Sequence, residues 1–181
     1  MLPIIFCVLF VLIALFVVAI LTRPPTFTVR RSRLIAAPPE QVFAQVVDFW
    51  AWIAWSPWEG LDPHSSRTFG TVTAGPGATY GWAGNRKVGA GRMTISNVRV
   101  HENIGIDIEF FRPFKAKNVV SFQFAASNAG TTVTWTMQGK NTVMGKVMSL
   151  VIDCDKLIGG PFDQGLASLA KICESPGRAS T

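Results

Sequence analysis

The chain contains few of the residues that build catalytic or metal centres. Its 181 residues include two histidines and one tyrosine. His64 and His101 lack the His-x-x-x-His or Cys-x-x-Cys spacing that is typical of metal ligands. The chain also lacks a Gly-x-Ser-x-Gly nucleophile elbow and a glycine-rich phosphate loop. We therefore expect neither a metal ion nor a cofactor.

Cysteine and charge are scarce as well. Cys7 lies within the first apolar run, and Cys154 and Cys173 could in principle pair. A secreted domain held by disulfides normally has more cysteines, so we expect these two to be free, buried thiols. Only 15% of the residues are charged, although the net charge is +6. The cations are scattered and form no basic run or known nucleic-acid motif, which argues against nucleic acid as a partner.

The longest apolar run lies at the start of the chain. Leu2–Leu21 contains no charged residue, and a helix of that length rises about 30 Å, the thickness of the hydrocarbon core of a bilayer. A cleaved signal peptide would have a shorter apolar core, a basic start and a small-x-small cleavage site. This run is longer than such a core, no lysine or arginine precedes it, and Thr22-Arg23-Pro24-Pro25 follows it in place of a cleavage site. We therefore expect a transmembrane helix that stays attached.

The flanks of this helix predict its orientation. Basic residues beside a span remain on the cytoplasmic side, and Arg23, Arg30, Arg31 and Arg33 follow the helix, whereas none precedes it. We therefore expect a single-pass protein of the cell (inner) membrane with a cytoplasmic domain, whose anchor and basic flank contact membrane lipids. The predicted layout is an anchor at 1–22, a linker at 23–26, a ligand-binding domain at 27–175 and a polar tail at 176–181.

The domain begins with a strand and a short helix. Phe27–Ile35 is β-rich, and Ala36–Glu40 contains the prolines and the acid that are typical of a helix start. Further strands are predicted by alternation: Ile104–Phe110 is apolar at even positions and places Asp107 and Glu109 on the opposite, wet face. Short turns with glycine or asparagine separate these strands, which favours an antiparallel meander.

The periodicity changes near the carboxyl end. Val143–Cys154 follows helical spacing, and a second helix is predicted from Phe162 to Glu174, after a break at Gly159-Gly160-Pro161. A long antiparallel sheet must cover its apolar face, and this helical region is the large partner available. A strongly curved sheet that grips a helix leaves space for a small ligand. We therefore predict an α+β fold.

Several local patterns are shared with a known superfamily. They are Arg33–Phe43 (RLIAAPPEQVF), Val47–Phe49, Trp55–Glu59 (WSPWE), Asp62-Pro63, Gly77–Tyr80, Trp82–Asn85, Val88–Met93, Thr132–Trp135 and Phe162–Ala167. They resemble the helix-grip superfamily called SRPBCC, which includes START domains, and most closely its bacterial polyketide cyclase/dehydrase-like branch. The resemblance implies a curved antiparallel sheet of six or seven strands around a long carboxyl-terminal helix, with an apolar cavity between them. Members bind, transfer, cyclise or sense ligands, so the fold alone does not give the function.

We expect the domain to bind an apolar small molecule such as a lipid, a fatty-acyl chain or a polyketide-like compound. The basis is the excess of large aromatic and flexible methionine side chains on predicted inward faces. A filled core predicts the same residues, so both interpretations stay open at this point. The candidate wall residues are Trp55, Trp58, Tyr80, Trp82, Met93, Ile95, Phe110, Phe122, Trp135, Met137, Met148 and Phe162.

Two other functions compete with ligand binding. The first is an enzyme of the polyketide cyclase/dehydrase type, for which Tyr80 and Arg92 are the candidate proton carriers. The simpler interpretation of Tyr80 is an inward aromatic side chain with its hydroxyl at the cavity rim. The second is a protein-interaction module beside the membrane. The sequence leaves the ligand and the oligomeric state open.

One short stretch is unusually rich in tryptophan. Trp50–Glu59 (WAWIAWSPWE) contains four of the six tryptophans of the chain. A membrane belt is disfavoured because the stretch lies about thirty residues beyond the anchor, which leaves a pocket border or a core plug. Trp52, Trp55 and Trp58 recur every three residues and should share one side of a helical turn. We expect Trp55 and Trp58 at the border, and Trp50 in either role.

Overall fold

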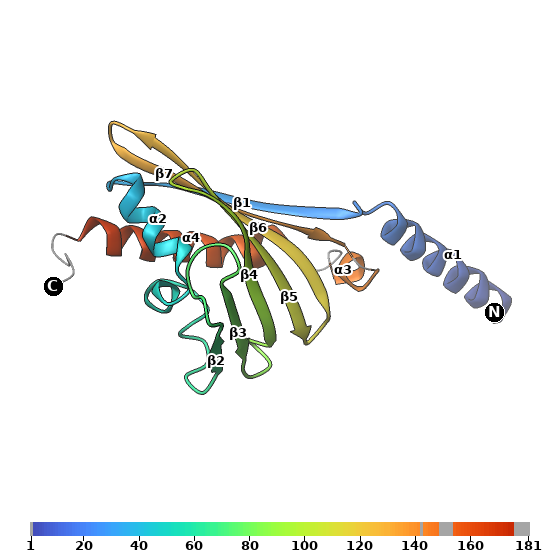
Figure 1. Ribbon diagram of the computed structural model, residues 1–181. Coiled ribbons are helices and arrows are strands. Elements are labelled where there is room, and N and C mark those ends of the chain that lie inside the picture. The colour runs from blue at the N-terminus through green and yellow to red at the C-terminus, as the bar shows by residue number, and fades with distance from the viewer. Residues whose placement is uncertain (1, 142, 149–153, 176–181) are drawn as a thin grey trace.

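A long apolar helix leads into a curved sheet, and a second long helix packs against that sheet (Figure 1). The computed structural model describes residues 2–141, 143–148 and 154–175, so the polar tail predicted at 176–181 lies outside it. The elements are α1 (Leu2–Leu21), β1 (Thr26–Ile35), α2 (Pro39–Val47), the 3-10 helix η1 (Ala51–Ala54), β2 (Ser66–Phe69), β3 (Thr79–Ala83), β4 (Ala90–Arg99), β5 (Asn103–Arg112), β6 (Ala116–Ser127), β7 (Gly130–Lys140), α3 (Val143–Met148) and α4 (Cys154–Glu174).

The strands form one antiparallel sheet in the order β1-β7-β6-β5-β4-β3-β2. Consecutive strands from β2 to β7 are neighbours, and β1 closes the order by pairing with β7 from Thr26↔Lys140 to Ile35↔Thr131. The prediction of an α+β helix-grip fold with six or seven strands is confirmed, and the sheet has seven. Sequence analysis did not anticipate β2, which is only four residues long and is largely exposed.

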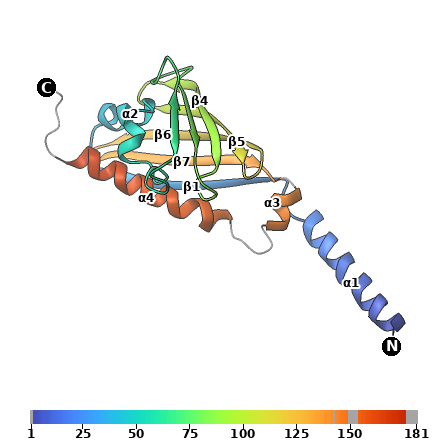
Figure 2. The same ribbon diagram turned by 90° about the horizontal axis from the view of Figure 1, so that it is seen from below.

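Alternation of side chains decides which face of the sheet is buried. In β6, Val120, Phe122 and Phe124 are buried, whereas Gln123 and Ala125 between and beyond them are exposed. These three buried side chains belong to the hydrophobic core between the sheet and α4. Figure 2 shows α4 running along this face of the sheet. We call this the inner face. Each large apolar side chain that it buries contributes about 1.5–3 kcal/mol to folding.

The carboxyl-terminal helix differs from the prediction in one respect. We expected a break at Gly159-Gly160-Pro161, but α4 runs through these residues without interruption from Cys154 to Glu174. Proline normally costs a helix interior one hydrogen bond and causes a clash with the preceding turn. Burial of Phe162, Leu166 and Leu169 against the sheet, at 0–1% exposure, offsets that cost. The helix predicted over Val143–Cys154 is described only as α3, because 149–153 lie outside the described residues.

An ion-pair cluster ties α4 to β1. The guanidinium of Arg31 donates to the Asp155 carboxylate at 2.7 and 2.9 Å and to Asp163 Oδ2 at 3.1 Å. The hydrogen bonds and charges of these carboxylates raise the pKa of Arg31 and lower that of Asp155. Gly159 makes the approach possible, because a Cβ there would lie 2.0 Å from Arg31 Nη2. The two glycines that suggested a break therefore include one that accommodates a side chain from the sheet.

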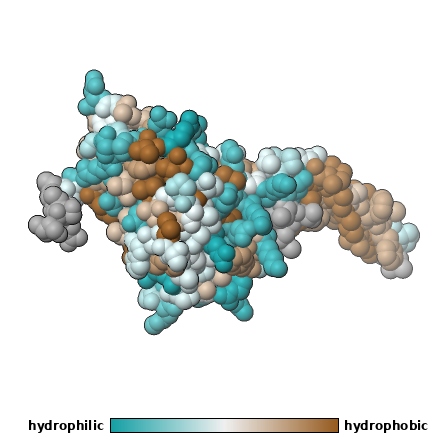
Figure 3. Space-filling view, in the orientation of Figure 1, coloured by the Kyte–Doolittle hydropathy of each residue, from teal (hydrophilic) through white to brown (hydrophobic). Residues whose placement is uncertain are grey.

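The amino-terminal helix projects away from the sheet. Of the helices that the structure describes, one, Pro3–Leu21, is long and apolar enough to cross a membrane by length and composition, and none of it is buried in the protein. In the space-filling view it is a continuous apolar rod, whereas the visible face of the domain is mixed (Figure 3). Two hydrogen bonds fix the linker that follows it, from Asn141 N to Pro25 O (2.8 Å) and from Asn141 Nδ2 to Pro24 O (3.0 Å).

We expect Phe162→Ala to lower the free energy of unfolding by about 3–5 kcal/mol, because the change leaves a cavity where α4 meets the sheet. Leu157→Ala is the matched control, since Leu157 lies on the same helix and is 57% exposed, and it should change stability by less than about 0.5 kcal/mol. Urea unfolding of the full chain in mild detergent measures both. Equal losses in the two variants would contradict the assigned packing of α4.

Candidate functional site: the inner face of the sheet

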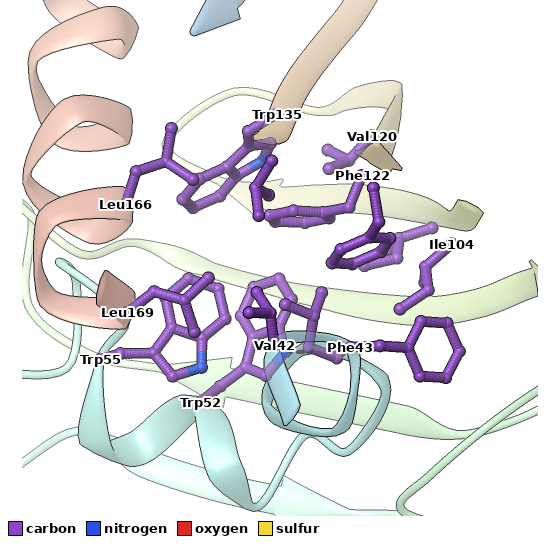
Figure 4. Close-up of a cluster of buried hydrophobic side chains, with 14 of the residues drawn as sticks. Val42, Phe43, Trp52, Trp55, Ile104, Val120, Phe122, Trp135, Leu166 and Leu169 are labelled. Carbon is purple, nitrogen blue, oxygen red and sulfur yellow. Dashed lines mark hydrogen bonds between the residues drawn. The ribbon is translucent and has the colours of Figure 1, made fainter. Parts of the chain in front are cut away.

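Aromatic side chains fill the middle of the inner face, between the sheet and α4 (Figure 4). Trp135 of β7 and Phe162 of α4 are stacked, with ring centroids 4.0 Å apart and planes at 9°. The ring of Trp135 also lies 4.7 Å from Phe122, 5.7 Å from Trp55 and 6.1 Å from Trp52. We call these five residues the aromatic cluster. Their mutual contacts mean that this part of the inner face is packed core.

The tryptophan-rich stretch supplies two members of this cluster. It folds as η1 and a following turn, and because a 3-10 helix has three residues per turn, Trp52 and Trp55 lie one above the other with centroids 4.7 Å apart. Trp55 is 2% exposed, so the expectation that it borders the opening is wrong: it belongs to the core. Trp58 is partly exposed, and Trp50 is 54% exposed and stacks on Phe69 at 3.9 Å.

The indole N–H groups of the cluster differ in their partners. Trp52 Nε1 donates to Val46 O at 2.9 Å and Trp55 Nε1 donates to Gln45 O at 3.0 Å, which holds η1 against α2. Trp135 Nε1 is buried and has no hydrogen-bond partner among the described residues. A buried donor without a partner costs about 1–3 kcal/mol. Trp135 is therefore the one member of the cluster with an unused donor.

Burial of the inner face is highest in the middle of the sheet and decreases toward both ends. Toward the end with the β6–β7 turn, Phe124 is 7% exposed and Val98 is partly exposed. We call the other end the α1 end, because β1 begins and β7 ends there. In the middle of the sheet the inward side chains are 0–1% exposed, namely those of Ile95, Ile104, Ile106 and Phe122. Exposure rises to 6–8% at Tyr80, Met93 and Ile108, and Trp82 and Phe110, nearer the α1 end, are partly exposed. Two residues border the middle of the sheet instead: Met137, in the same row as Ile106, is 6% exposed, and Trp58, whose ring lies 5.7 Å from Trp135, is partly exposed. We call Tyr80, Met93, Ile108, Trp82, Phe110, Met137 and Trp58 the rim.

The geometry of the rim depends on a glycine. The Trp82 ring lies over Gly91 of the paired strand, where a Cβ would come within 2.5 Å of the ring. The same ring stacks on Tyr80 at 6.3 Å and meets Phe110 edge-on at 5.8 Å, and its Nε1 donates to Val88 O. The absence of a side chain at position 91 therefore lets an aromatic wall form across β3, β4 and β5.

A polar group lies at one side of the rim. Tyr80 Oη donates to Glu59 Oε1 at 2.5 Å, and Arg67 Nε donates to Glu59 Oε2 at 2.6 Å. Burial raises the pKa of the Tyr80 hydroxyl, and the hydrogen bond to Glu59 raises it further. The same carboxylate raises the pKa of Arg67. We call Glu59, Arg67 and Tyr80 the polar trio. Its carboxylate accepts one hydrogen bond on each oxygen.

The structure separates the two residues that were considered as proton carriers. Tyr80 pairs with Met93 across β3 and β4 and lies on the inner face. Arg92 precedes Met93, is exposed, and lies on the outer face near Glu109. The two side chains therefore cannot act on one bound molecule. The histidines lie outside this region: His64 follows Asp62 in a loop, and His101 is in the β4–β5 turn with a φ of 60°.

The candidate wall residues fall into three groups. Trp55, Phe122, Trp135 and Phe162 belong to the aromatic cluster, and Trp58, Tyr80, Trp82, Met93, Phe110 and Met137 belong to the rim. Ile95 lies in the fully buried middle of the sheet. The side chain of Met148 lies outside the described residues. The cysteines lie apart from this region or outside the description. Cys173 is buried and free, as expected, and Cys7 is free and exposed on α1. The side chain of Cys154 is not among those described.

Sequence reasoning missed Trp52, Ile108, Glu59 and Arg67 as residues of this region. Trp52 and Ile108 carry the same periodicity as the residues that were chosen, so the signal was present. Glu59 also had a signal, since it is an acid that directly follows the tryptophans. Arg67 had none, because its role depends on the pairing of β2 with β3.

An antiparallel sheet curved around one long helix, with an apolar inner face packed against that helix, defines a helix-grip domain. Comparison with known families agrees: residues 26–174 match the family described as polyketide cyclase / dehydrase and lipid transport. The chain belongs to that family. Among curated proteins, none matches the chain significantly.

Solved structures share the fold at low sequence identity. The di-domain ARO/CYC BexL from the BE-7585A biosynthetic pathway matches with a TM-score of 0.63 and 15% identity, over 89% of this chain and 54% of that one. Protein CV1439 from Chromobacterium violaceum matches at 0.60 and 17%, over 82% and 97% of the two chains. The Aha1 dimer from Colwellia psychrerythraea matches at 0.59 and 14%, over 82% and 96%.

The single tyrosine allows a direct test of the polar trio. Because burial and Glu59 raise its pKa, Tyr80 should remain un-ionised in the folded chain beyond the value of about 10 at which it titrates after unfolding. The stability that this shift contributes is complete below that pH and is lost as the pH rises above it. Tyrosinate absorbance of folded and denatured chain measures the difference. Glu59→Gln should move the pKa of Tyr80 in the folded chain toward 10. An unchanged tyrosine titration in this variant would contradict the hydrogen bond between Tyr80 and Glu59.

Proposed function

We propose that the domain binds an apolar small molecule at the rim, with the molecule reaching inward toward the aromatic cluster. The observation that carries this proposal is the loss of burial along the inner face, from 0–1% in the middle of the sheet to partly exposed aromatic side chains at the α1 end. A concave apolar surface with a few polar groups is the usual form of a small-molecule site.

Trp135 suggests what one end of the ligand carries. Its unpartnered N–H needs an acceptor, and a carbonyl or carboxyl oxygen is the acceptor that lipids, fatty acids and polyketides share. Met93 and Met137 of the rim have flexible side chains that adapt to ligands of different shape. The family description, which includes lipid transport, supports the same class of ligand.

We also propose that α1 anchors the protein in the cell (inner) membrane and that the domain lies in the cytoplasm. The length and composition of Pro3–Leu21 support a span, and the cations that follow α1 support this orientation. Such an anchor holds the rim beside the bilayer, since Trp82 and Phe110 of the rim lie toward the same end of the sheet as the anchor.

A second candidate function is a reaction of the polyketide cyclase/dehydrase type. The observation that favours it is the polar trio, because Glu59 faces the rim with its carboxylate already hydrogen-bonded to Tyr80 and Arg67. In this proposal Glu59 is the general base, and the aromatic wall holds the chain in one folded geometry. The Glu59→Gln chain separates the two candidates, since it should retain ligand and lose any turnover.

Removal of the Trp135 N–H should weaken binding of a ligand that carries an acceptor. With oleic acid as the probe, we expect Trp135→Phe to lower affinity by about two- to twelvefold, the equivalent of one net hydrogen bond. Affinity for a hydrocarbon of similar length should change much less. Isothermal titration of the full chain in mild detergent measures both.

Trp52→Phe is the matched control for this test, because its indole is equally buried but already donates to Val46 O. That change should reduce stability and leave the preference for oleic acid over the hydrocarbon unaltered. If neither probe binds, and native mass spectrometry of the extracted chain finds no copurifying apolar molecule, the binding proposal fails.

Reporter fusions at the carboxyl terminus test the orientation. A reporter that is active only in the cytoplasm should function, and one that is active only in the periplasm should not, because the cations after α1 stay inside. Arg23→Glu should weaken this preference. Activity of the periplasmic reporter on the native chain would overturn the proposed orientation.

A further inference from the structure

The exposed loops at the α1 end of the sheet carry cations. The β3–β4 loop (84–89) contains Arg86 and Lys87, and the β5–β6 hairpin tip (113–115) is flanked by Arg112 and contains Lys115. All four side chains are exposed, and among the described residues none forms an ion pair. The loops adjoin each other, because β4 and β5 pair at Ala90↔Arg112.

The β5–β6 hairpin also exposes apolar side chains. Phe111 is 44% exposed and Phe114 is 56% exposed, and each lies beside a cation of the same hairpin. A single exposed apolar side chain is common on protein surfaces, but apolar side chains that gather in one short segment mark an interaction or membrane site. Aromatic rings next to lysine and arginine are the composition of segments that lie in the head-group region of a bilayer.

The position of the anchor determines which surface the hairpin meets. Only four residues, 22–25, separate α1 from β1, so they span at most about 17 Å. Asn141, directly after β7, binds this linker at Pro24 and Pro25, which fixes it to the α1 end. Figures 1 and 2 both show α1 leaving the sheet at the end where β5 turns into β6.

The opposite end of the sheet has a different character. The β4–β5 turn contains Arg99 with Glu102, which lie 3.9 Å apart, and the exposed Val100. The β6–β7 turn contains no charged residue. Among the described residues, the combination of unpaired cations and exposed phenylalanine therefore lies at the end that the proposed anchor holds near a bilayer.

We propose that the β5–β6 hairpin is a second membrane contact, in which Phe111 and Phe114 enter the head-group region and Arg112, Lys115, Arg86 and Lys87 bind anionic phospholipids. This inference rests on the proposed membrane anchorage and goes beyond it, since an anchor alone leaves the domain free to rotate. With α1 and the hairpin both attached, the rim faces the lipid surface.

Hydrogen exchange of the full chain in nanodiscs tests the contact. Nanodiscs of phosphatidylcholine alone are compared with nanodiscs that also contain phosphatidylglycerol. We expect amides of 111–117 to exchange roughly tenfold more slowly with the anionic lipid, since several cations act together, and high salt should remove the difference. Amides of the β4–β5 turn should exchange equally in both.

Two exposed-site variants complete the design. Phe114→Asp should abolish the slow exchange of the hairpin, whereas Val100→Asp, the matched change at the opposite end, should preserve it. Unchanged exchange of β6 and β7 shows that each variant folds. If the chain stays embedded but 111–117 exchange at the same rate in both lipids, this proposal is overturned and the anchor stands. If alkaline carbonate extracts the chain from vesicles, the proposed transmembrane anchor is contradicted, and the proposed hairpin contact is contradicted with it.

Discussion

The packing of one helix against one curved sheet is the constraint on which the rest of this structure depends. The stack of Phe162 on Trp135 sets the position of α4, and Gly165 permits it, because a Cβ there would lie 2.9 Å from the Trp135 ring. Arg31 adds a second, polar attachment beside Gly159. Small residues on α4 thus occur where large groups of the sheet come close, which explains why the sequence places glycines inside a long helix despite their cost of about 1 kcal/mol each.

Much of the fold could be predicted from the sequence because the sheet has one wet and one dry face. Alternation in β5, β6 and β7 identified the inward residues, and the prolines before Glu40 identified the start of α2. The threefold spacing of Trp52, Trp55 and Trp58 correctly indicated a shared side. What spacing could not decide is depth. Trp55 is buried against Phe122 and Trp135 of the sheet whereas Trp58 is partly exposed, and that difference is a property of the tertiary fold.

The errors share a physical origin. Continuity of α4 through Pro161 depends on burial of the residues that follow it, which local propensity does not include. The polar trio joins the tryptophan-rich turn, β2 and β3, so no local pattern reports it. Arg92 was a reasonable candidate by composition, but one step in a strand reverses the face of a side chain. Sites assembled from several segments are therefore the least accessible to sequence reasoning.

The asymmetry of the sheet connects the two proposals. At the far end, the inner face is closed by α2, whose Val42 and Val46 are fully buried, and by α4, whose Glu174 binds Ala36 N. At the other end, Trp82 and Phe110 of the inner face are partly exposed, and the same end carries the linker to α1 and the basic hairpin. An apolar ligand that entered there from a bilayer would not have to cross water, where exposure of its chain costs about 0.8 kcal/mol per methylene. A domain held in this way has no need to diffuse with its cargo, and tethering keeps the effective concentration of membrane ligand high. On the two proposals, the rim, the anchor and the cations belong to one arrangement.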